Sequence, residues 1–64
     1  MSRELYRGTF NYQGEVHTIY RHTPKTASWF QITKVLAKEL GISHYSIRQF
    51  FSGNKDNFTI EKIK

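Results

Sequence analysis

The sequence ITKVLAKELGISHYSIRQFFSG, residues 32–53, decides how the rest of the chain can fold. Its first half carries apolar residues at helical spacing, Gly41 interrupts the pattern, and a shorter apolar repeat follows. This arrangement is typical of two amphipathic helices that pack at a steep angle across a glycine-containing turn. We expect helices over residues 28–40 and 43–52, with Gly41 ending the first helix and Ser43 capping the second.

The segments on either side of these helices are typical of strands. Residues 5–22 are rich in Tyr, Phe, Thr, Val and Ile, and no proline occurs before Pro24. They predict a hairpin, and the alternating sequence FTIEKI at residues 58–63 predicts a third strand paired with it. The expected fold is α+β in the order β-β-α-α-β. A three-stranded antiparallel sheet is covered by one main helix and a short second helix, in a single domain of residues 1–64.

The hairpin allows two registers, which differ in the length of the loop. A three-residue loop at residues 12–14, with Gly14 left-handed, pairs Phe10 with Val16. A two-residue loop pairs Phe10 with His17 instead. Because the longer loop gathers the apolar side chains on one face, burial favours the register in which Phe10 meets Val16.

In that register the two faces of the hairpin have different characters. Gly8 lies at the centre of the apolar face, where the missing side chain leaves room for a ring from a covering helix. The opposite face carries Arg7, His17 and Arg21, and we expect a compact basic patch there.

Charge favours an anionic partner. The 64 residues include ten Lys and Arg but five Asp and Glu, a formal net charge of +5. A small particle with this charge attracts polyanions, although the same charge also serves simple solubility. No apolar run approaches the ~20 residues of a membrane span, and the N-terminus lacks a signal-peptide core. We therefore expect a cytoplasmic protein without a membrane partner.

The sequence offers no set of groups suited to catalysis or metal binding. There is no cysteine, so disulfides, thiolate metal sites and Cys nucleophiles are excluded. Asp56 is the only aspartate and lies in a polar turn, while the glutamates are scattered. His17, His22 and His44 have no cysteine beside them, and the first two point to opposite faces of the hairpin. We expect no enzyme activity, cofactor, metal or small-molecule substrate.

One stretch resembles a known family. Ala37, Gly41 four positions later, and the apolar Ile47 and Phe50 on the next helix have the spacing of the helix-turn-helix unit of bacterial and phage DNA-binding proteins. The resemblance covers residues 32–53. It implies that the second helix enters the major groove of DNA.

The residues that this resemblance assigns to DNA contact lie on the outward side of the second helix. Gln49 would pair with adenine, and Arg48 with guanine or a phosphate. These outward side chains have no evident role in folding, and basic residues elsewhere would contact phosphates. The helix positions are Ser43, His44, Tyr45, Arg48 and Gln49, and the additional basic residues are Arg7, Arg21, Lys34 and Lys38.

A looser resemblance spans more of the chain. The archaeal ribosomal LX family has a β-β-α-β plan and docks on ribosomal RNA, and this sequence is similar to it except for an extra stretch at residues 49–58. The similarity implies the same topology and an RNA partner. The shared positions are residues 6–10, Gly14, residues 40–41, His44, Arg48 and residues 59–63.

These observations favour a small basic regulatory or accessory protein that binds nucleic acid, DNA in preference to RNA, through the helix-turn-helix-like corner. Two alternatives stay open. One is a protein-interaction module of phage or mobile-element type that adds an edge strand to a larger protein or presents Phe30 to it, since Phe30 lies off the apolar stripe of the first helix. The other is a ribosome- or RNA-associated protein. A homodimer is a further option, because one short helix rarely reads DNA tightly alone.

Overall fold

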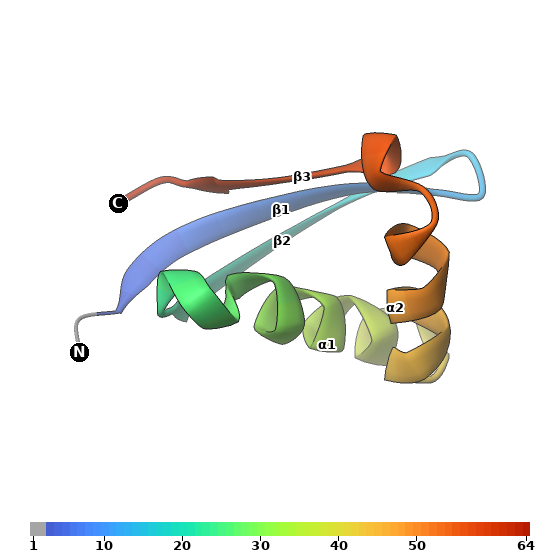
Figure 1. Cartoon of the computed structure of the whole chain (residues 1–64), viewed down its shortest axis with the longest axis horizontal. Coiled ribbons are helices and arrows are strands. Elements are labelled where there is room, and N and C mark those ends of the chain that lie inside the picture. The colour runs from blue at the N-terminus through green and yellow to red at the C-terminus, as the bar shows by residue number, and fades with distance from the viewer. Residues whose placement is uncertain (1–2) are drawn as a thin grey trace.

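The computed structural model describes residues 3–64 and has the expected order of elements (Figure 1). The α+β fold predicted from the sequence is therefore confirmed. A hairpin is followed by two helices and a last strand, and a short 3-10 turn precedes α1 and another follows α2. The elements are β1 (Glu4–Tyr12), β2 (Glu15–Thr23), η1 (Lys25–Ala27), α1 (Ser28–Leu40), α2 (His44–Ser52), η2 (Lys55–Asn57) and β3 (Phe58–Lys62).

The central strand of the sheet is β1, because the strand order is β2-β1-β3 and both pairings are antiparallel. The last strand thus pairs with the hairpin of its own chain, as the sequence predicts. Beyond β3, the backbone N–H of Ile63 donates to the carbonyl oxygen of Leu5 at 2.8 Å. Both helices lie on the same side of the sheet (Figure 1), so no helix or strand of residues 3–64 covers its other face, the open face.

The hairpin closes with a two-residue loop, so the register expected from burial is wrong. Gln13 and Gly14 both have positive φ angles, 52° and 84°, as in a type I′ turn, whose twist matches that of the flanking strands. Phe10 therefore lies opposite His17 rather than Val16. Val16 instead lies on the open face of the sheet, where it is 66% exposed.

The corrected register explains the role of Gly8. Its partner on β2 is Ile19, which is buried. A Cβ atom on Gly8 would lie 2.5 Å from Cγ2 of Ile32 and 2.6 Å from Cε2 of Phe10. The glycine thus lets α1 approach the sheet closely, as expected, but the space holds a methyl group of Ile32 and the ring of Phe10 rather than a ring from the helix.

The basic patch expected from Arg7, His17 and Arg21 does not form. His17 and Arg21 lie on the side of the sheet that faces the helices, whereas Arg7 lies on the open face. Arg7 also forms an ion pair with Glu61 of β3. The three cationic positions are therefore separated, and the charge of Arg7 is offset locally.

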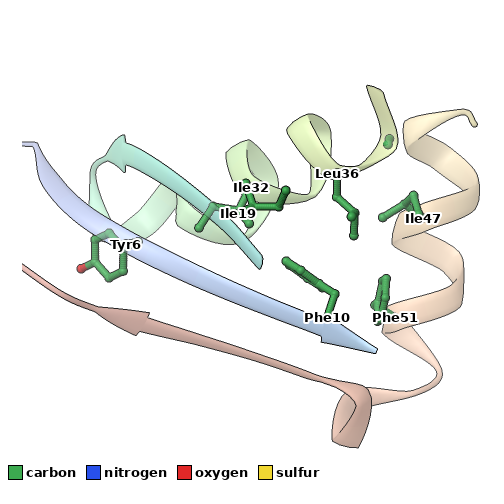
Figure 2. Packing of buried hydrophobic residues seen from close by; sticks show 8 residues of the cluster. Tyr6, Phe10, Ile19, Ile32, Leu36, Ile47 and Phe51 are labelled. Carbon is green, nitrogen blue, oxygen red and sulfur yellow. The ribbon is translucent and has the colours of Figure 1, made fainter. Parts of the chain in front are cut away.

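The hydrophobic core lies between the sheet and the two helices (Figure 2). Ile32 and Leu36 of α1 are fully buried, which confirms the apolar stripe predicted for that helix. Ile47 and Phe51 are the fully buried residues of α2. The core consists of Tyr6, Phe10, Ile19, Ile32, Leu36, Ala37, Ile47 and Phe51.

Local signals define the turn between the helices. Gly41 ends α1 with a left-handed φ of 71°, as predicted. At the start of α1, Ser28 is the first helical residue, and its hydroxyl donates to the carbonyl oxygen of Lys25 at 2.9 Å. No helix within residues 3–64 has the length and apolar character needed to cross a membrane.

We expect Gly8→Ala to destabilise the fold. The added methyl would press on Ile32 and Phe10, both fully buried, and such overpacking costs about 1–3 kcal/mol. That cost exceeds the ~0.4–1 kcal/mol gained by restricting the unfolded chain. Urea denaturation measures the difference.

The matched control is Gly53→Ala. Gly53 has a φ of −90°, and the nearest atom to an added Cβ is 3.8 Å away, so this variant should unfold close to wild type. Equal stability of the two alanine variants would contradict the close packing at Gly8.

Candidate nucleic-acid interface

The α2 helix has one buried face and one exposed face. Ile47 and Phe51 point into the core (Figure 2). Arg48 and Gln49 are exposed, and Tyr45 is 68% exposed. Because the buried residues fix the rotation of the helix, these three polar side chains are held toward solvent.

Ser43 serves the fold directly, as its predicted role of helix cap requires. Its Oγ accepts a hydrogen bond from the backbone N–H of Ser46 at 3.1 Å and donates to Oγ of the same residue at 2.8 Å. The hydroxyl thereby satisfies one of the free N–H groups at the start of α2.

His44 is half-buried between the two helices. Its Nε2 lies 2.9 Å from Oγ1 of Thr33. The Thr33 hydroxyl donates to the carbonyl oxygen of Trp29 at 2.8 Å, which leaves its oxygen able to accept from His44 in the tautomer that carries the proton on Nε2. The imidazole also meets the ring of Phe30 edge-on at 4.8 Å. His44 thus joins α2 to α1, and the expectation that it has no role in folding is wrong.

Positive charge surrounds His44. Burial of the imidazole, followed by the charges of Arg48 and Lys34, lowers the pKa of His44 below its ordinary value of 6.5. Cζ of Arg48 lies 5.6 Å from the centroid of the Phe30 ring, within the range of a cation–π contact. At neutral pH the corner between α1 and α2 therefore combines a neutral imidazole with two permanent cations.

Arg48 also borders a cleft of about 550 Å³. Its apolar part includes Trp29 of α1 and Phe58 of β3, whose rings stack at 4.7 Å. Lys25 and Lys55 line the cleft together with Arg48, and none of the lining side chains is acidic. The cleft therefore suits an anionic ligand with apolar or aromatic parts.

Sequence reasoning identified only part of this cleft. Arg48 and Gln49 line it, and helical periodicity predicted both as outward residues. Trp29 was not among the residues predicted for the site. Lys25 and Lys55 were missed because they lie in short turns, whose position beside α2 depends on tertiary packing.

The remaining basic residues lie in separate places. Lys34 and Lys38 are exposed on successive turns of α1, and the first of them is near His44. Arg21 is exposed on β2, and Arg7 lies on the open face of the sheet. The structure thus brings Arg48 and His44 together with Lys34, places Gln49 beside Arg48 at the cleft, and leaves the sheet arginines apart.

Known proteins provide no guide to this site. The chain matches no protein-family model, and no curated protein or solved structure is significantly similar to it. Within residues 3–64, no group of three or more His, Asp or Glu side chains could hold a metal ion. The function must be inferred from the side chains themselves.

Ser43→Ala should lower the free energy of unfolding by about 1 kcal/mol, because it removes the cap of α2. The control is Ser52→Ala, which removes an exposed serine from the other end of the same helix. Thermal unfolding compares the two variants. A loss of stability in both, or in neither, would contradict the capping role of Ser43.

His44 should make stability depend on pH. Because folding lowers the pKa of His44, the unfolded chain binds the proton more readily. The resulting stabilisation is complete above the pKa that His44 has in the unfolded chain. It is lost as the pH falls through the lower pKa that His44 has in the folded protein. The variant His44→Gln keeps a side-chain donor but cannot titrate.

We therefore expect wild type to lose more stability than His44→Gln on acidification from pH ~7.5 to ~5. Urea denaturation at each pH measures this difference. Parallel losses in the two proteins would show that His44 is not the titrating group responsible.

Proposed function

We propose that this protein binds nucleic acid, duplex DNA in particular, through the exposed face of α2. It would act as a small cytoplasmic accessory or regulatory protein. The observation that carries the proposal is the position of Arg48, which borders both the cationic corner at Lys34 and the acid-free cleft at Lys25 and Lys55. These cations supply charge for phosphates around one exposed helix.

The side chains of α2 are suited to base contacts as well as to phosphate contacts. Gln49 carries an amide that can donate to and accept from the N6/N7 edge of adenine. Arg48 can bind guanine in a bidentate manner or contact a phosphate. Tyr45, at 68% exposure, offers a hydroxyl at the same surface. This is the use of a second helix that the resemblance to the helix-turn-helix unit implies.

A rigid exposed helix favours duplex DNA over duplex RNA. The major groove of B-form DNA is about 12 Å wide and admits an α-helix, whereas the major groove of A-form RNA is too deep and narrow for side chains to read. The buried Ile47 and Phe51 and the capped start at Ser43 keep α2 well defined in the absence of a ligand.

The alternative of a protein-interaction module is favoured by the positions of Arg7 and Arg21, which lie on the sheet apart from α2, but it lacks a second feature that it requires. It requires an apolar surface around Phe30 or Phe51. Phe51 is fully buried, and Phe30 is 44% exposed with the guanidinium of Arg48 above its ring. The apolar patch is thus confined to part of one ring, beside fixed positive charge.

Arg48→Gln should weaken binding to duplex DNA by roughly tenfold, within the ~1–3 kcal/mol typical of an arginine that contacts a base. If Arg48 contacts a phosphate instead, the salt slope of binding should fall by about one unit. Fluorescence anisotropy across a salt series measures both quantities. Single-stranded DNA and structured RNA serve as comparison ligands.

Arg7→Gln is the matched control for charge. It removes the same net charge from the open face of the sheet, away from α2, and should leave binding nearly unchanged. Equal weakening by both variants would show that only overall charge matters. The absence of salt-dependent binding by wild type to any of the nucleic acids would refute the proposal.

A further inference from the structure

Within residues 3–64, no strand pairs with the outer edge of β2. β2 is a terminal strand of the sheet and pairs with β1 over all nine of its residues. Natural sheets protect such edges with proline, bulges, short strands or charged side chains. β2 has no proline, no lysine and no break in its register, and its charged residues are Glu15 and Arg21. The other terminal strand, β3, has five residues, so the edge of β2 is the longer of the two.

The turn determines which backbone groups face outward. Tyr12 and Glu15 flank the two-residue loop and form its hydrogen-bonded pair, and such pairs then alternate along the hairpin. The N–H and C=O groups of the intervening residues consequently point away from β1. No backbone hydrogen bond between elements of residues 3–64 uses them. The outward residues of β2 are Val16, Thr18, Tyr20 and His22.

We propose that two copies of the chain form a symmetric dimer by antiparallel pairing of these β2 edges, with Thr18 of one copy opposite Thr18 of the other. The two three-stranded sheets then form one sheet of six strands. Outward residues pair with outward residues, so the same side chains share a face in both copies. The helices of the two copies therefore lie on the same side of the combined sheet.

This register is self-complementary on the open face of the sheet. With Thr18 at the centre, Val16 of each copy lies opposite Tyr20 of the other. Val16 is 66% exposed and Tyr20 is 57% exposed in the single chain. Contacts between β-branched and aromatic residues that lie opposite each other stabilise antiparallel sheets, and the two-fold axis forms this contact twice.

The same register is complementary in charge on the other face. Glu15 of each copy lies opposite Arg21 of its mate, again twice, and both residues are exposed. If the two-fold axis moves by one residue, to Ile19, His17 lies opposite Arg21. Glu15 then lies opposite Thr23, and the contact between Glu15 and Arg21 is lost. Charge complementarity therefore selects the register centred on Thr18, with a second copy of this chain as the occupant of the edge.

Charge reversal tests the pairing in the full-length protein without nucleic acid. Sedimentation equilibrium should show a concentration-dependent dimer for wild type. Glu15→Arg and Arg21→Glu each place like charges opposite one another twice, and each should raise the dimer dissociation constant at least about tenfold. An equimolar mixture of the two variants should regain the wild-type dissociation constant, because every pair in the mixed dimer again joins opposite charges.

Glu39→Arg is the matched control. It makes the same charge change at an exposed position of α1 and should dimerise as wild type does. Circular dichroism checks that each variant is folded, and recovery in the mixture is possible only for folded chains. A wild type that stays monomeric would overturn the proposal, as would single variants that dimerise normally or a mixture that stays monomeric. A monomer that captures an extended peptide along β2 would assign the edge to a different protein.

Discussion

The ring of Phe10 holds the sheet, the second helix and the last strand together. It is fully buried on the central strand, meets Phe51 of α2 edge-on at 5.1 Å and stacks on Phe58 of β3 at 5.9 Å. Such pairs contribute about 0.5–1.5 kcal/mol each beyond the burial of their area, and a chain this short buries only roughly 60% of its unfolded surface. A few rings therefore supply much of the stability. Because Ile47 and Phe51 anchor α2 from within, Gln49 lies on the opposite side of the helix and Arg48 lies on the flank of the buried face, where both are exposed to solvent.

The sequence was sufficient for the helices because their signals are local. Gly41 and Ser43 act within one turn of the chain, and they ended α1 and capped α2 as predicted. The hairpin register failed because the argument compared side-chain burial alone and gave no weight to the strand twist that a two-residue turn matches. Gln13 adopts a left-handed conformation, which few non-glycine residues do. The register that follows buries Ile19 and exposes Val16.

The candidate site was predictable only where it depends on one helix. Periodicity alone placed Arg48 and Gln49 on the outward side of α2. The role of His44 depends on how α2 packs against α1, because its partner Thr33 lies eleven positions away. The cleft depends in addition on η2, which brings Lys55 beside α2. Side chains that meet through tertiary packing leave no fixed spacing in the sequence, so the cleft could not be predicted from it.

The dimer inferred from β2 bears on how a helix of nine residues could bind DNA firmly. With Thr18 at the centre, the two hairpin turns lie at opposite ends of the shared edge, and the two Glu15 residues are about 20 Å apart along the strands. Each α2 lies near its own turn end (Figure 1) and packs on α1 rather than on β2. Because the two helices lie on the same side of the combined sheet, two weak contacts could act together on one DNA molecule, as in dimeric proteins that bind two half-sites.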